Sequence, residues 1–196
     1  MESSQPASTT NAPSSLNLLS LSADAGVAHS RKPANEAIMG VLHLDVNDPM
    51  GDTPAWMPSK MQHPDPQFQC ASTASNIYRQ AMLASNVIDS VDDPDHRELM
   101  QVLVPNWIKA MKGLAEEIPA DQIRPGDVVV GLGGIKGEPQ NNDRHIGFVG
   151  DYDPQTQKFA AYSNAMGTLR LQDLDDRFGR YREEHFYRLY FPEEPS

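Results

Sequence analysis

The distribution of apolar and polar positions divides the chain into a polar N-terminal segment, a helical region and a region of strands. Residues 1–32 are rich in Ser, Thr, Ala, Asn and Pro and show no sustained period of 2 or 3.6. Such a composition cannot bury enough apolar surface to fold, and it is typical of a disordered arm. We therefore predict an arm over 1–32 and one folded domain over 33–196.

The middle of the chain predicts helices. An apolar run over 37–44 fits a buried helix or strand, and the Pro- and Gly-rich residues 48–54 end it. The stretch 70–85 places small and apolar residues at i, i+4, i+7 and i+11, which predicts a helix with one buried face. A second helical region is predicted over 95–118, and Pro105 divides it into two helices joined by a kink.

After Pro119 the pattern changes to short runs of β-branched and aromatic residues, separated by turn signals at 151–154 and 165–167. The predicted strands are 127–132, 146–149, 158–163, 168–171 and 186–191. Helices followed by antiparallel strands indicate an α+β fold, in which N-terminal helices pack on a sheet of about five to six antiparallel strands.

Composition narrows the functional classes. The chain has 16 Lys+Arg against 27 Asp+Glu and a net charge of −11, which argues against nucleic-acid and anionic-membrane partners. The single cysteine cannot form an intramolecular disulfide, and no Cys/His cluster has zinc spacing, so we expect no metal and no cofactor. The N-terminus lacks a basic region, and the apolar run 16–21 is too short for a signal peptide or membrane span. We expect synthesis in the cytoplasm, with export by a dedicated system or release by lysis.

Candidate chemistry begins at the lone cysteine, Cys70, at the start of a predicted helix. The positive end of the helix dipole favours the thiolate. His145 opens a later strand and Asn164 lies in the next one, which is the papain-like order of nucleophile, base and orienting amide. Simpler interpretations remain: Cys70 as a small buried residue, His145 as a strand-edge residue and Asn164 as a turn former before 165–167.

The predicted roles follow from hydrogen-bonding chemistry. The amide oxygen of Asn164 can accept the Nδ1 proton of His145, so that Nε2 faces the thiol. The backbone N–H of Cys70 is the expected oxyanion donor, and Gln67 or Gln69 is a candidate second donor.

Flanking segments supply further candidates. Trp56 lies in the Pro-rich loop before the cysteine and is predicted to line the cleft. The polar loop 133–143, directly before the histidine, is placed to contact substrate. The acidic runs 92–95 and 173–176 lack calcium-loop spacing and are predicted to cap helices or to remain solvated.

Together, three motifs resemble the NlpC-type and CHAP-type amidases and peptidases of bacterial cell walls. They are the helix headed by Cys70, the run Arg-Pro-Gly-Asp-Val-Val-Val at 124–130 and the run Arg-His-Ile-Gly-Phe-Val-Gly at 144–150. The resemblance covers about residues 65–191. It implies a papain-like core and hydrolysis of an amide bond, with peptidoglycan stem peptides as the substrate class.

The third site position departs from the CHAP pattern. CHAP domains tend to place Glu-x-Asn on the strand after the histidine, whereas this chain has Tyr162-Ser163-Asn164. NlpC-type enzymes often use a second histidine there, and this chain has none at that position. The resemblance therefore retains Asn164 as the orienting residue and adds Tyr162 as a candidate substrate contact.

The resulting expectation is a monomeric cysteine peptidase or amidase that acts as a phage lysis enzyme or a delivered antibacterial effector. Its partners would be a peptidoglycan peptide or a protein substrate, together with an immunity or chaperone protein. Two alternatives stay open. One is a secreted effector that cleaves or deamidates host proteins, and the other is a catalytically inactive binding or structural protein on the same fold.

Overall fold

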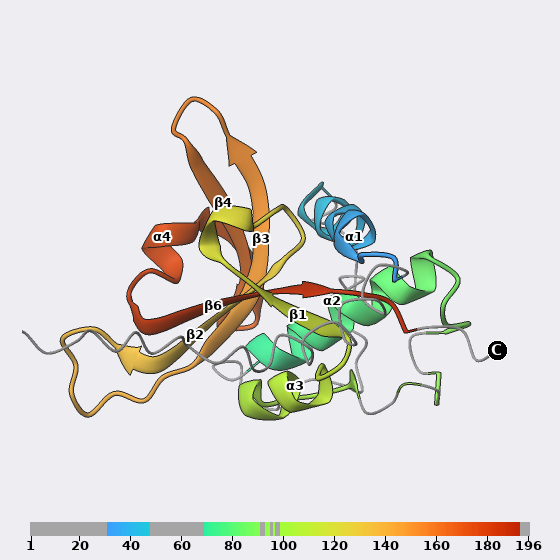
Figure 1. Ribbon diagram of the computed structural model, residues 1–196, viewed down its shortest axis with the longest axis horizontal. Helices are drawn as coiled ribbons and strands as arrows, with labels where there is room; N and C mark the ends of the chain where they lie inside the picture. Colours follow the sequence, from blue (N-terminus) through green and yellow to red (C-terminus); the bar gives the residue numbers. More distant parts are fainter. Residues whose placement is uncertain (1–30, 48–68, 91–92, 95, 97–98, 193–196) are drawn as a thin grey trace, which may run out of the picture. The chain divides into compact units, whose positions relative to one another are not determined.

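The computed structural model describes residues 31–47, 69–90, 93–94, 96 and 99–192, and its central feature is a six-stranded antiparallel sheet. The strands are β1 (Ala115–Ile118), β2 (Val128–Ile135), β3 (His145–Asp153), β4 (Lys158–Ala165), β5 (Thr168–Asp173) and β6 (Tyr181–Leu189). Their spatial order is β1-β6-β2-β3-β4-β5 (Figure 1). The α+β class and the antiparallel sheet are therefore confirmed. The predicted arm over 1–32 lies almost wholly outside the described residues.

Within the described ranges, four α-helices flank the sheet: α1 (Asn35–Asn47), α2 (Cys70–Ala84), α3 (Val104–Ala110) and α4 (Leu174–Arg177). The first three lie on one side of the strands and α4 lies on the other (Figure 1). Side chains alternate along a strand, so Ile146 and Phe148 of β3 face α2. Val149 faces the opposite side, where it packs with Phe178, the residue that follows α4. The sheet thus has a core on each face, and α2 covers the larger one.

Helix α2 begins at Cys70 and ends at Ala84, close to the predicted bounds. The prediction of one buried face is incomplete, because the helix is buried on nearly every side between the sheet, α1 and α3. Polar side chains in this setting need partners. Ser75 Oγ donates to the carbonyl of Gln101, and the fully buried Arg79 donates to the carbonyls of Asp93 and His96, each at 2.8 Å.

The Pro-Gly-Asp turn before β2 connects the sheet to α1. Asp127 is fully buried and accepts hydrogen bonds from Asn35 Nδ2, the Arg124 backbone N–H, and Arg188 Nε and Nη2. Gly126 has φ +87°, and a Cβ there would lie 2.5 Å from the backbone oxygen of Asn35. Only glycine accommodates both the positive φ and this close approach.

The region 95–118 differs from its prediction. The helix begins at Val104, so Pro105 lies in its first turn and not at a kink between two helices. Proline suits this position because a first-turn N–H has no acceptor within the helix. Gly113, at φ +92°, follows the end of the helix, and 115–118 form the edge strand β1. A short, largely exposed edge strand carries little apolar period, which is why its sequence pattern does not reveal it.

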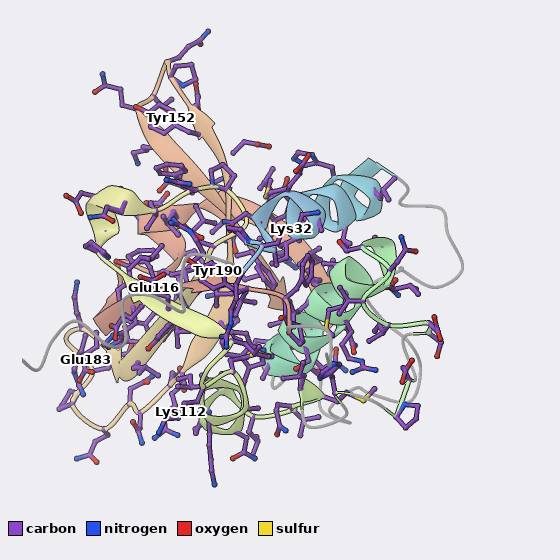
Figure 2. The ribbon with its side chains drawn as sticks, turned by 45° about the vertical axis from the view of Figure 1, so that its right-hand side comes forward. Lys32, Lys112, Glu116, Tyr152, Glu183 and Tyr190 are labelled. Carbon is purple, nitrogen blue, oxygen red and sulfur yellow. The ribbon has the colours of Figure 1, made fainter. Side chains whose placement is uncertain are left out.

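Strand β6 also begins earlier than predicted, at Tyr181, because the charged residues of its first half lie on exposed positions. At its other end, Tyr190 donates to Glu116 Oε2 at 2.7 Å, and the two side chains lie together in Figure 2. Pro33 forms a β-bridge with Tyr190, so the segment entering α1 is held at the end of the sheet. Tyr152 projects from the β3–β4 hairpin, away from the helices (Figure 2).

Candidate active site

A cleft of about 560 Å³ lies at the end of the sheet where α2 begins. Its walls bring together Cys70, His145 and Asn164 with three arginines, Arg144, Arg177 and Arg180. A second cavity, of about 320 Å³ against Trp107 and Tyr187, contains none of the three predicted catalytic residues. The larger cleft is therefore the candidate active site.

Cys70 is the first residue of α2 and only 8% exposed. The side chain of the N-cap residue, Gln69, makes no capping hydrogen bond, and the backbone N–H groups of Cys70 and Ala71 lie within hydrogen-bonding reach of the thiol. Burial nevertheless raises the pKa of the thiol above its ordinary value. The backbone N–H groups of Ile146, Ala71 and Cys70 and the charge of Arg177 act against this, without reversing it. The net effect is a raised thiol pKa, opposite in direction to the prediction, because burial outweighs the backbone hydrogen bonds and the Arg177 charge.

His145 is the first residue of β3 and is 7% exposed. Its ring lies 5.5 Å from that of Phe178, on the α4 face of the sheet. A Cβ at Gly147 would lie 3.0 Å from the Phe178 ring, so the glycine in the His-Ile-Gly run gives Phe178 its place beside the imidazole. Burial, together with Arg177 and Arg180, lowers the pKa of His145 to about 3.

Arg177 connects His145 to the neighbouring strand. Its Nη2 lies 2.6 Å from His145 Nε2, and its Nε donates to Ser163 Oγ at 3.2 Å. A guanidinium can only donate, so Nε2 is the acceptor and the imidazole proton is on Nδ1. Arg177 ends α4, a single turn whose N-cap is Asp173, and Asp173 Oδ1 accepts from the N–H of Asp176. The predicted capping role of this acidic run is confirmed.

The sequence pattern gives no direct signal for Arg177, because it lies in a run of charged residues. The position of Arg177 becomes predictable only when Asp173 is recognised as an N-cap. One helical turn after this cap places the arginine next to Ser163 of β4.

Asn164 forms a different contact from the predicted one. Its Nδ2 donates to Thr73 Oγ1 at 2.8 Å, and its Oδ1 accepts from the N–H of Gly167 at 3.0 Å. The first bond connects β4 to the first part of α2, and the second forms the turn after β4. Among the described residues, no hydrogen bond joins Asn164 to His145, and none joins the Cys70 thiol to the imidazole.

Of the remaining predicted site residues, two are buried and two lie outside the described residues. Tyr162 is 3% exposed and packs over Gly150, along β3 away from His145, and burial raises the pKa of its hydroxyl. It is a core residue and does not line the cleft. Gln69 is buried directly before Cys70. Trp56 and Gln67 lie outside the described residues.

Within the part of the chain that the structure describes, no three His, Cys, Asp or Glu side chains gather as metal ligands. None of the described helices is long and apolar enough to cross a membrane. The chain matches no protein-family model, no curated protein and no solved structure.

Proposed function

We propose that the protein is a papain-like cysteine hydrolase that cleaves an amide bond, with peptidoglycan stem peptides as the substrate class. One observation carries the proposal. A single cleft holds a cysteine at an uncapped helix N-terminus together with a buried, neutral histidine. The substrate class rests on the motif resemblance to NlpC-type and CHAP-type enzymes.

In the proposed reaction, His145 Nε2 takes the thiol proton of Cys70 as the sulfur attacks the amide carbonyl. The oxygen of the tetrahedral intermediate accepts hydrogen bonds from the first-turn N–H groups of α2. His145 then passes its proton to the departing amine, which leaves a thioester. Water, activated by the same imidazole, hydrolyses the thioester and restores the thiol.

Two rearrangements precede the first proton transfer. Arg177 must leave Nε2, because its N–H occupies the lone pair that the base needs. The thiol and imidazole, which line the same cleft without bonding, must then come into contact. Catalytic hydrogen bonds commonly tighten only when substrate is bound.

The same features favour a second candidate, a non-catalytic binding protein on this fold. A thiol with a raised pKa and a histidine whose Nε2 is occupied by an arginine suit a site that binds without reacting.

The test is the release of free amines from purified sacculi by the full chain, with Cys70→Ser and His145→Asn as variants. We expect release by the wild type and its loss, by at least about a hundredfold, in both variants. Release from a denatured protein substrate but not from sacculi would assign the enzyme to protein targets. Equal, negligible release by all three proteins would favour the binding protein.

A further inference from the structure

The cleft carries positive charge in a chain that is strongly acidic overall. Of the described residues that line it, three are arginines, Arg144, Arg177 and Arg180, and one, Asp143, carries a carboxylate. The whole chain has a net charge of −11. A local field of opposite sign to the net charge, focused in a cleft, attracts anions.

Neither Arg177 nor the exposed Arg180 forms an ion pair with a carboxylate among the described residues. Arg177 is half-buried, and its hydrogen bonds go to the neutral acceptors Ser163 and His145. The guanidinium of Arg180 lies 5.7 Å from the centre of the Tyr181 ring. By contrast, Arg188 is paired with a buried carboxylate, that of Asp127, at 2.9 Å.

Arg177 is partly desolvated and has no counter-charge among the described residues, which is unfavourable, and a ligand anion would supply the missing charge. The exposed Arg180 adds a second positive charge to the same cleft. A carboxylate matches the guanidinium fork and forms stronger, charge-assisted hydrogen bonds than a neutral imidazole nitrogen does. An anion that binds Arg177 therefore also draws it away from His145.

We propose that Arg177 and Arg180 form a carboxylate-binding subsite beside Cys70, and that the substrate carries a carboxylate next to the bond that is cleaved. The subsite stands on the cleft geometry, whereas the statement about substrate rests on the proposed hydrolase function. Binding of that carboxylate releases His145 Nε2, so the correct substrate completes the catalytic pair.

Cys70 is the only cysteine, so alkylation reports on this cleft alone. Iodoacetate and iodoacetamide undergo the same reaction, in which the thiolate forms an S–C bond and iodide leaves, but only iodoacetate is an anion. We measure the rate constant for iodoacetate divided by that for iodoacetamide, in the folded protein and in the urea-unfolded chain. We expect the ratio to be about tenfold higher in the folded protein, which corresponds to about 1.4 kcal/mol of attraction.

The variants Arg177→Gln and Arg180→Gln should each lower this ratio toward the unfolded value. Arg177→Lys keeps the positive charge but not the planar guanidinium, and should retain part of the increase in this ratio. Arg124→Gln is the matched control, because Arg124 is exposed and precedes the end of β2 that lies away from His145. A ratio equal to that of the unfolded chain, or one that Arg124→Gln lowers as much as the cleft variants do, overturns the subsite.

A second measurement does not require a reactive thiol. Glutarate should raise the melting temperature of the full chain more than its neutral diamide, glutaramide, does, and this difference should disappear in Arg177→Gln. Equal effects of the two compounds on the wild type overturn the subsite.

The source of the carboxylate is distinguished by protection of Cys70 from iodoacetamide. Protection by Ala-Ala-Ala with a free C-terminus, but not by its amide, assigns a terminal carboxylate. Protection by Ala-Glu-Ala amide assigns a side-chain carboxylate, and protection by neither peptide overturns the statement about substrate. None of these measurements requires turnover, so inactivity toward sacculi would overturn the hydrolase and leave the subsite standing.

Discussion

Arg177 Nη2 lies 2.6 Å from Nε2 of His145, and the arginine rather than the histidine holds the positive charge next to the Cys70 thiol. The donor-only guanidinium requires an unprotonated Nε2, which agrees with the low pKa of the buried imidazole. In a thiolate–imidazolium pair the charge would be on the histidine. The resting site therefore contains a neutral thiol, a neutral imidazole and an arginine.

The first prediction concerns the pH dependence of Cys70 alkylation. Burial raises the thiol pKa, so the rate with iodoacetamide should still be rising above the ordinary thiol pKa of about 8.5. The Arg177 charge lowers that pKa, so Arg177→Gln should shift the profile to still higher pH. Stopped-flow alkylation between pH 5 and about 10 gives both profiles. A rate that is already constant below neutral pH would instead indicate a thiolate–imidazolium pair.

The second prediction concerns stability in acid. The pKa of His145 is about 3 in the folded protein and near 6.5 when unfolded. Between these values the unfolded chain binds a proton that the folded protein excludes, so the free energy of unfolding should fall as the pH drops. The slope from this group is at most about 1.4 kcal/mol per pH unit. Urea unfolding between neutral pH and pH 4 should show a shallower fall for His145→Asn than for the wild type.

His185 provides a control of opposite sign. Hydrogen bonds to Glu117 and Glu183 raise its pKa, so it stabilises the folded protein below its ordinary pKa and loses this effect as the pH rises. His185→Asn should therefore steepen the fall in acid. If both histidine variants steepened it, the assignment of His145 as a neutral buried base would be wrong.

The third prediction concerns Asp127, whose buried carboxylate accepts from Asn35, Arg124 and Arg188. Asp127→Asn leaves the charge of Arg188 without its counter-ion and should lower the free energy of unfolding by about 3 kcal/mol. Lys158→Gln breaks an exposed pair with Asp173 and should change stability far less. Urea unfolding of both variants tests this. Similar losses would mean that the Pro-Gly-Asp turn does not hold α1 to the sheet.

Local periodicity is sufficient to predict the elements that carry the candidate chemistry. The helix starting at Cys70 and the strands containing His145 and Asn164 follow from apolar spacing and turn residues in the sequence. Strand β1 is not predictable in this way, because it is a short edge strand whose exposed positions carry no period. Pro105 illustrates a further ambiguity, since a proline can equally break a helix or begin one.

The contacts within the site depend on long-range geometry that a single sequence does not encode in any local pattern. Arg177 reaches His145 only because α4 returns the chain to the face of β4 that carries Ser163. Asn164 is predicted to accept the Nδ1 proton of His145, but its hydrogen-bond partners are Thr73, one turn into α2, and the N–H of Gly167. Sequence order places residues in one neighbourhood, whereas side-chain direction decides which of them bond.

The fourth prediction separates the two roles of Asn164. Through its bond to Thr73 it holds α2 against β4, and so positions Cys70. Asn164→Ala and Thr73→Val should each cost about 1–2 kcal/mol of stability, because each leaves a buried polar group without its partner. The double variant should be less destabilised than the sum, with a coupling energy of at least about 0.5 kcal/mol. Urea unfolding of the four proteins gives this cycle.

The same four proteins are also compared by their kcat for amine release from sacculi. If Asn164 acts by positioning α2, Asn164→Ala and Thr73→Val should lower kcat to a similar extent, and the double variant should be no worse than either. If Asn164 instead turns toward His145 during turnover, Asn164→Ala should lower kcat much more than Thr73→Val does. A larger effect of Asn164→Ala would support the predicted role of Asn164 as the amide that orients His145, because Thr73 has no part in fixing the imidazole tautomer.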